Sequence, residues 1–215
     1  PFKGINIPVA LSGDRGLTNS LWGMHYSPPD GAVAVLATDG SRLDTGAVGS
    51  AVVFLDDNIR RHEFNPHEHS WSIPAADRPD NYVAEMAAIN KALRSVPITV
   101  DVHIYTDSLS SIQAIQSFRG SGSQDPMLRC HSRPYLRAVA EALHAREEAG
   151  AISHMEHVYS HTGKRDIQST GNEAADRAAR RGALMAGYTE SIDLLHYELP
   201  FIVSIDHPNS DPDAD

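Results

Sequence analysis

The chain has 215 residues, a formal net charge of −10 at neutral pH and one cysteine, Cys130. This length suits one compact domain with extensions. No apolar run approaches the 18 residues of a membrane-spanning helix, which argues against a membrane partner, and one cysteine excludes an intrachain disulfide. With no basic-then-apolar leader visible, we expect an intracellular setting, in the cytoplasm or the nucleus.

The negative charge is concentrated near the C-terminal end. Residues 188–215 contain seven of the 28 acidic residues and none of the 18 basic ones. The rest of the chain is therefore close to neutral, so its charge does not exclude a nucleic-acid partner. We expect an N-terminal arm or linker over residues 1–31, a domain over 32–187 and an acidic extension over 188–215.

Helix and strand patterns alternate within residues 32–187, which predicts an α/β domain. The first strand is an apolar run that begins at Val33 and stops at Asp39. Further strands are predicted over 48–55, 59–64, 100–106 and 152–159, with a polar loop over 66–79. Helices are predicted over 81–93, 108–118, 134–148 and 172–186. Thr170 and Glu173 have the spacing of a capping box at the start of the last helix.

Four acidic residues occupy positions that need an explanation. Asp39 and Asp107 each end an apolar strand, Glu85 lies on the apolar side of the first helix, and Asp176 is flanked by alanines in the last. If the two strands are parallel neighbours, both aspartates emerge at the same carboxyl edge of the sheet. Clustered acids repel one another, and a hard divalent cation such as Mg²⁺ removes that conflict.

Each acid alone has a simpler interpretation as a turn, capping or solvent-facing residue. Taken together, the residues around them resemble the four acid motifs of the ribonuclease H family, in the family's order. The motifs are Thr38-Asp39-Gly40-Ser41, Glu85-Met86-Ala87-Ala88-Ile89, Tyr105-Thr106-Asp107-Ser108 and Gly171-Asn172-Glu173-Ala174-Ala175-Asp176. The resemblance covers about residues 32–187 and is strongest to ribonuclease H domains of retroelement reverse transcriptases.

The resemblance implies a ribonuclease H-like fold, a five-stranded mixed sheet flanked by helices. It also implies two Mg²⁺ ions, for which Mn²⁺ can substitute, and hydrolysis of the RNA strand of RNA/DNA hybrids to 5′-phosphate and 3′-hydroxyl ends. Asp39 and Asp107 would contact both ions, Glu85 the ion nearer the leaving group and Asp176 the ion that activates water. A reverse transcriptase domain on the same parent polypeptide is the expected protein partner.

A histidine and three substrate-binding residues are also implied by the resemblance. Ser160-His161-Thr162-Gly163 is similar to the family's flexible loop, whose histidine assists proton transfer or product release. His161 precedes Asp176 by 15 positions, a longer spacing than the family usually has. Gly40 and Ser41 would bring backbone close to the RNA strand, and Asn81 aligns with a position that contacts the RNA 2′-hydroxyl.

Two other functions remain open at this point. The same fold could serve a nuclease for another duplex, because Tyr82 and Val83 replace the family's usual polar and basic pair. It could also serve as a scaffold that binds nucleic acid or protein without cutting. Zinc is the less favoured interpretation of two histidine sets, which lack cysteine partners and helical spacing; these are His62, His67 and His69, and His154, His157 and His161.

Overall fold

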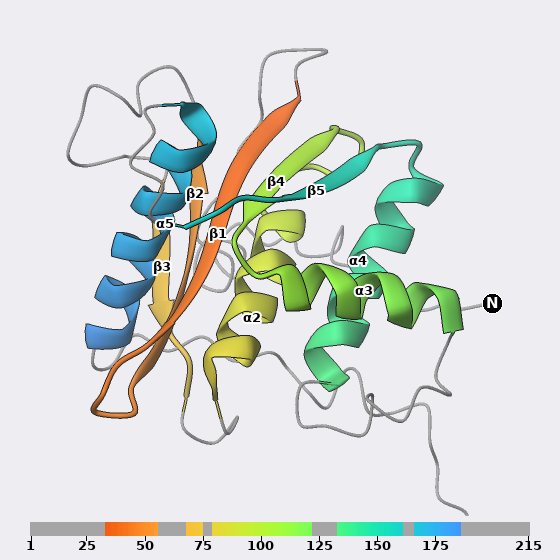
Figure 1. Cartoon of the computed structure of the whole chain (residues 1–215). Coiled ribbons are helices and arrows are strands. Elements are labelled where there is room, and N and C mark those ends of the chain that lie inside the picture. The colour runs from red at the N-terminus through yellow and green to blue at the C-terminus, as the bar shows by residue number, and fades with distance from the viewer. Residues whose placement is uncertain (1–32, 56–67, 75–78, 122–132, 161–165, 186–215) are drawn as a thin grey trace, which may run out of the picture.

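The structure, a computed structural model, describes residues 33–55, 68–74, 79–121, 133–160 and 166–185. Within these ranges the chain forms a five-stranded sheet and four helices (Figure 1). The strands are β1 (Ala34–Arg42), β2 (Val48–Phe54), β3 (Glu68–Ser72), β4 (Val102–Thr106) and β5 (Ser153–His157). The helices are α2 (Asn81–Arg94), α3 (Leu109–Ser121), α4 (Arg133–Glu148) and α5 (Ile167–Leu184).

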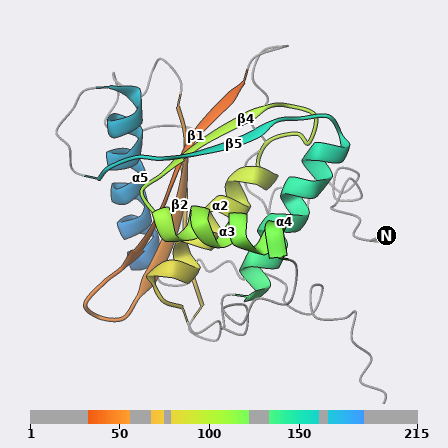
Figure 2. The same ribbon diagram turned by 45° about the vertical axis from the view of Figure 1, so that its right-hand side comes forward.

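The sheet is mixed, with the strand order β3-β2-β1-β4-β5. β2 runs antiparallel to β1 and β3, whereas β4 runs parallel to both β1 and β5. Helices α2 and α4 lie on one side of the sheet and α5 lies on the other (Figure 2). This arrangement confirms the predicted five-stranded mixed sheet with flanking helices.

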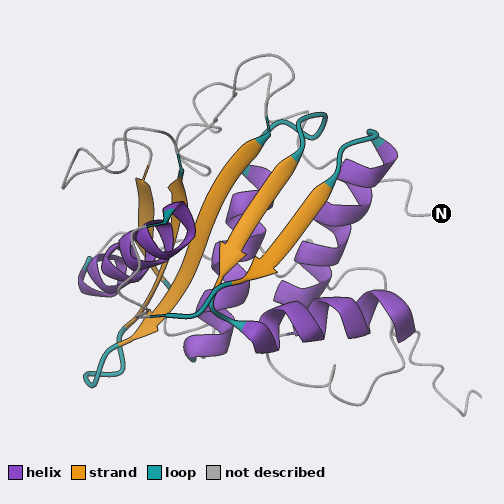
Figure 3. Ribbon diagram, turned by 45° about the horizontal axis from the view of Figure 1, so that its top comes forward, coloured by secondary structure: helices purple, strands orange, loops and turns teal. Residues whose placement is uncertain are grey.

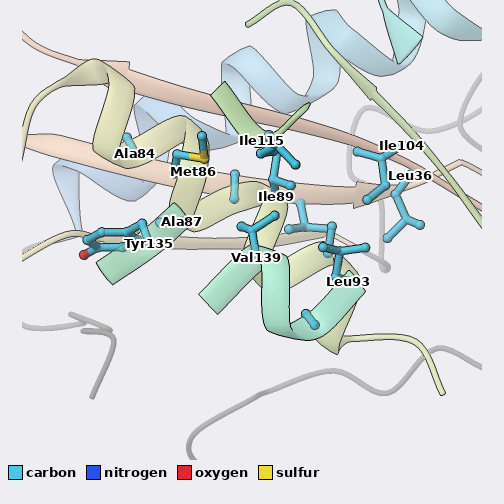
Figure 4. Packing of buried hydrophobic residues seen from close by; sticks show 14 of the residues in the cluster. Leu36, Ala84, Met86, Ala87, Ile89, Leu93, Ile104, Ile115, Tyr135 and Val139 are labelled. Carbon is cyan, nitrogen blue, oxygen red and sulfur yellow. The ribbon is translucent and has the colours of Figure 1, made fainter. Parts of the chain in front are cut away.

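The larger hydrophobic core lies between the sheet and helices α2, α3 and α4 (Figure 4). Leu36 and Ile104 from the sheet pack there with Ile89 of α2, Ile115 of α3 and Val139 of α4. These apolar side chains recur at the spacing that places them on one face of each helix. The core therefore fixes α2 against β1 and β4, the two strands that carry predicted metal ligands.

The smaller core lies under α5 and is built from small residues. Ala175, Ala178 and Ala179 of α5 are fully buried against the sheet. A Cβ atom at Gly49 of β2 would lie 2.1 Å from the backbone nitrogen of Ala183, which is closer than any real contact. Alanine and glycine thus let α5 approach the sheet closely.

The described residues include a fully buried cation, Arg146, beside the larger core. The guanidinium of Arg146 on α4 donates through all three nitrogens, and its Nε contacts Ser153 Oγ at 3.1 Å. The other acceptors are backbone carbonyls at the end of α2 and in the α2–β4 connection, those of Leu93 (3.0 Å), Val96 (3.1 Å), Pro97 (3.3 Å) and Val100. Burial lowers the pKa of Arg146 to about 10, and nearby Asp101 opposes that shift. Arg146 therefore ties α4 to the chain that leads into β4.

Three sequence predictions were wrong. The strand predicted to stop at Asp39 continues to Arg42, because β1 stays paired with β2 through that residue. The predicted polar loop over 66–79 contains the edge strand β3, in which only His69 and Trp71 are buried. Helix α5 begins at Ile167 rather than near residue 172, because Asp166 caps it and accepts a hydrogen bond from Ser169 N at 2.7 Å. Thr170 therefore lies inside the helix and is not its cap.

Some predictions fall on residues that the structure does not describe. The predicted strand over 59–64, the arm over 1–31 and the whole extension over 188–215 lie outside the described ranges. The proposed domain boundaries accordingly stay predictions. Among the helices that the structure describes, none combines the length and hydropathy needed to span a bilayer.

Candidate metal centre

The parallel pairing of β1 and β4 brings two of the predicted acids together. Thr38 of β1 is the register partner of Thr106 of β4. Asp39, the next residue of β1, and Asp107, which directly follows β4, therefore lie beside one another where β4 reaches its carboxyl end. This is the edge at which open α/β sheets place their sites. The predicted adjacency of Asp39 and Asp107 is confirmed.

The third acid, Glu85, comes from helix α2, which contacts β1 at Gly40. A Cβ atom at Gly40 would lie only 2.5 Å from Glu85 N, so glycine is required for this close approach. Ser50 of β2 also binds α2, by donating to the carbonyl of Ala84 at 2.9 Å. As a result, one carboxylate oxygen from each of Asp39, Glu85 and Asp107 lies within 4.8 Å of the others.

Two of these carboxylates are buried without full hydrogen bonding. Asp39 is 5% exposed and Glu85 is 4% exposed. Asp39 Oδ2 and Glu85 Oε2 have no hydrogen-bond partner among the described residues. Buried polar atoms are nearly always paired, and an unpaired one needs an explanation such as an absent ion.

Burial and repulsion both act on the protonation of this pair. Burial, together with the charges of Asp107 and Asp176, raises the pKa of Asp39 from its ordinary 3.8 to about 8. Burial and the charges of Asp39 and Asp107 likewise raise the pKa of Glu85 well above its usual range. Hydrogen bonding to the Gly40 backbone opposes both shifts. The ionised cluster is thus short of positive charge.

The fourth acid, Asp176, lies at the rim of the cluster. It is on α5, its side chain is 26% exposed, and Arg180 Nε donates to its Oδ1 at 3.1 Å. Its charge contributes to the raised pKa of Asp39, so it lies near the site. It is not part of the group of three acids whose oxygens lie within 4.8 Å of one another.

Two residues at the site were not predicted as site residues. Asn172 of α5 is 2% exposed, and its Nδ2 donates to Asp107 Oδ2 at 3.4 Å. The ring nitrogen His157 Nε2 is 3.2 Å from the carbonyl oxygen of Asp107. Asn172 belongs to the motif that contains Asp176, so its position in that motif was the available signal. His157 precedes the loop of His161 and carried no comparable signal.

The remaining predicted site residues, which were assigned to substrate binding and proton transfer, lie outside the group of three acids or outside the described residues. Asn81 is exposed at the start of α2, and its Nδ2 lies 3.5 Å from Glu85 Oε1. Gly40 is buried against α2, and Ser41 beside it is half-buried. His161 lies outside the described residues. The substrate-binding roles of Gly40, Ser41 and Asn81 therefore stay predictions.

The three acids fit a hard divalent cation. Such ions take carboxylate oxygens as ligands, and unpaired oxygens are available on Asp39 and Glu85. A cation would also offset the burial and the repulsion that together raise the two pKa values. The arrangement can therefore hold a divalent metal ion at this edge of the sheet.

The RNase H family model matches residues 31–184. Among solved structures, the chain is similar to the RNase H domain of PFV, with 19% identity, a TM-score of 0.54, and coverage of 70% of this chain and 94% of that one. It is similar to the prototype foamy virus protease–reverse transcriptase, with 18% identity and a TM-score of 0.51 over 74% of this chain, but it spans only 22% of that protein.

A foamy viral protease–reverse transcriptase structure in complex with double-stranded DNA is also similar, with 20% identity, a TM-score of 0.52, and coverage of 74% of this chain and 98% of that one. At these identities the similarities show a shared fold. No curated protein matches the chain. The family model, by contrast, covers well over half of the sequence and all four acid motifs: the chain belongs to the RNase H family.

Proposed function

We propose that this chain is a metal-dependent endonuclease that hydrolyses the RNA strand of RNA/DNA hybrids. The observation that carries the proposal is the acid group of Asp39, Glu85 and Asp107, with two buried carboxylate oxygens that lack a partner among the described residues. Structural acids are normally paired when buried. Unpaired acids at the site edge of an RNase H domain are the arrangement that metal-dependent phosphodiester hydrolysis requires.

Asp39, Glu85 and Asp107, with Asp176 at the rim, would hold two Mg²⁺ ions, for which Mn²⁺ can substitute. When bound, two such ions supply an activated water and charge stabilisation for the leaving oxygen of an in-line displacement. Hydrolysis with the 3′-oxygen as the leaving group produces 5′-phosphate and 3′-hydroxyl ends. This assignment of ions and products is part of the proposal.

The chain's own residues prepare the site for that chemistry. Asn172 orients Asp107 by donating to its Oδ2, and His157 contacts the backbone of the same residue. Arg180 holds the carboxylate of Asp176 at the rim. Outer contacts of this kind fix the orientation of ligating carboxylates.

Substrate recognition rests on groups beside the acids. The amide of Asn81 is exposed one helical turn from Glu85, where it can hydrogen-bond an RNA 2′-hydroxyl, the group that distinguishes RNA from DNA. Gly40 and Ser41 would lie close to the RNA backbone. His161 would assist proton transfer or product release.

The biological setting is proposed on the same basis. The similarity to the prototype foamy virus protease–reverse transcriptase, of which this chain spans 22%, supports a reverse transcriptase domain as partner on a parent polypeptide. An RNase H unit of that kind acts inside the cell, in the cytoplasm or the nucleus.

The test uses three end-labelled duplexes of one sequence, an RNA/DNA hybrid, an all-DNA duplex and an all-RNA duplex, each with Mg²⁺ or with chelator. We expect the parent chain to cut only the RNA strand of the hybrid, only with Mg²⁺ or Mn²⁺, and to leave 3′-hydroxyl ends. Asp107→Asn should abolish cleavage.

Preferential cutting of either control duplex would instead identify a nuclease for another substrate. Hybrid binding without any cutting in Mg²⁺ or Mn²⁺ would favour a non-cleaving scaffold. Cleavage by Asp107→Asn at the parent rate would overturn the assignment of the site.

A further inference from the structure

A second group of side chains that could hold a metal ion lies on the face of β4 and β5 that is turned away from α2 and α4. The parallel register pairs His103 with His154, and Tyr105 with Glu156. Residues two apart in a strand share a face, and Tyr105 packs in the small core beneath α5. His103, His154 and Glu156 therefore lie on the α5 side of the sheet.

This part of the sheet is open to solvent. Figure 3 shows α5 in front of the other end of the sheet, with no described helix in front of β4 and β5. The side chains of His103, His154 and Glu156 are 26%, 60% and 38% exposed. The three groups are thus held by two rigid neighbouring strands and can be reached by an ion from water.

The donor atoms are close enough to share one ion. His103 Nε2 lies 2.9 Å from Glu156 Oε2, and His154 Nε2 lies 4.0 Å from the same oxygen. One donor atom from each of the three residues lies within 4.8 Å of the others. Zinc holds its ligands at about 2.0–2.2 Å, so tetrahedral ligands are roughly 3.3 Å apart. Small side-chain movements would therefore bring all three atoms onto one ion.

Neighbouring side chains already orient two of the three groups. Gln168 Nε2 of α5 donates to Glu156 Oε1 at 3.3 Å, which leaves Oε2 directed at the imidazoles. The rings of His103 and Tyr105 stack at a centroid distance of 4.5 Å. Outer contacts of this kind are what fix ligand orientation in metal sites.

We propose that His103, His154 and Glu156 form a second metal site, selective for Zn²⁺ over Mg²⁺, that is separate from the carboxylate site. Imidazole ligands favour zinc, whereas Mg²⁺ prefers oxygen ligands alone. Two histidines and one glutamate leave a fourth position open to solvent, as in zinc sites with three protein ligands. The ion joins β5 to β4 and stabilises the folded chain. The proposal extends beyond the proposed nuclease activity and does not depend on it.

The test titrates Zn²⁺ into the purified full chain by calorimetry, with saturating Mg²⁺ present to occupy the carboxylate site. We expect saturable binding of one Zn²⁺ that weakens at least tenfold in both His154→Ala and Glu156→Gln. At a free Zn²⁺ concentration about a hundredfold above Kd, zinc should also raise the melting temperature of the parent chain by roughly 5–10 °C. Circular dichroism checks that each variant is folded.

Two controls separate this site from others. His144→Ala removes a matched histidine, which pairs with Glu148 at 3.5 Å on α4, and should leave zinc binding unchanged. Asp107→Asn alters the carboxylate site and should also leave zinc binding at the histidine site unchanged. The proposal would be overturned if the parent bound no zinc in Mg²⁺, which would leave only an ion pair between His103 and Glu156. It would equally be overturned if His154→Ala and Glu156→Gln bound zinc like the parent.

Discussion

Arg146 and the pair Asp39 and Glu85 are all buried charges in one small domain, yet their surroundings are opposite. All three guanidinium nitrogens of Arg146 have acceptors, mostly backbone carbonyls. Asp39 and Glu85 each retain a carboxylate oxygen without a partner among the described residues, and other acids lie beside them. Burial lowers the pKa of Arg146 and raises those of the two acids, because it disfavours the charged form in both cases.

This difference indicates that Arg146 has a structural role and that Asp39 and Glu85 have a functional one. A buried charge whose hydrogen bonds are complete holds the fold together by itself. A buried charge with missing partners destabilises the fold until a ligand supplies them, and such groups concentrate at functional sites. The acids should therefore be dispensable for folding and essential for activity. Arg146, in contrast, should be needed for folding and should take no direct part in the chemistry.

The largest expected effect on stability is that of Arg146→Ala. The substitution leaves a cavity and deprives several buried carbonyls of their donor. We expect it to lower the free energy of unfolding by about 3–5 kcal/mol, measured by urea denaturation. Arg119→Ala is the matched control, because Arg119 makes only an exposed ion pair with Glu147; its cost should stay below about 1 kcal/mol. Equal costs for the two variants would contradict a structural role for Arg146.

The raised pKa values of the buried acids predict an unusual dependence of the free energy of unfolding on pH. The pKa of Asp39 lies near 3.8 unfolded and at about 8 in the folded chain, so between these values the folded state binds more protons. Stability must then fall as pH rises through that window. In chelator we expect the parent to lose about 1–3 kcal/mol between pH 5 and pH 8.5 from this cluster, in urea denaturation.

Asp39→Asn isolates the contribution of the acids. The variant should be more stable than the parent at pH 8.5 in chelator and similar to it at pH 5. Mg²⁺ should stabilise the parent more at pH 8.5 than at pH 5, because the ion and protons compete for the same oxygens. If Asp39→Asn were instead less stable than the parent at pH 8.5 in chelator, the acids would be structural and the contrast with Arg146 would fail.

A smaller effect is expected from Asn172→Ala. Loss of its hydrogen bond to Asp107 frees a ligating carboxylate, and removal of such outer contacts typically costs 10–100-fold in metal affinity or activity. We expect hybrid cleavage at low Mg²⁺ to fall about tenfold and to recover partly at high Mg²⁺. Gln113→Ala, which removes an exposed amide on α3, should have no effect. A decrease in cleavage that no Mg²⁺ concentration restores would argue against a positioning role.

The placement of Asp39 and Asp107 at one edge of the sheet was predictable from the sequence, because the signals for it are local. Asp39 lies at the end of a continuous apolar run, which is typical of a strand buried on both faces, and Asp107 directly follows the strand Val102–Thr106. Parallel pairing of those strands then places the two acids together. The local signals at Glu85, on the apolar side of its helix, and at Asp176, flanked by alanines, are weaker, and the resemblance to a family joined these two acids to the pair.

Other features depend on contacts that no local pattern contains. Strand β3 is mostly polar and is a strand because it pairs with β2, burying only His69 and Trp71. The cluster of His103, His154 and Glu156 forms through the register of β4 with β5, across about 50 residues of sequence. The acceptors of Arg146 are carbonyls, which carry no side-chain signal at all.

The most direct test of the central claim is cleavage of a labelled RNA/DNA hybrid in Mg²⁺ by Asp39→Asn, with Asp44→Asn as the control. Asp44 is an exposed acid in the turn between β1 and β2. We expect Asp39→Asn to cut at least about a thousandfold more slowly, because it removes a metal ligand while keeping the side-chain shape. Asp44→Asn should cut at the parent rate. Cleavage by Asp39→Asn at the parent rate would contradict the account.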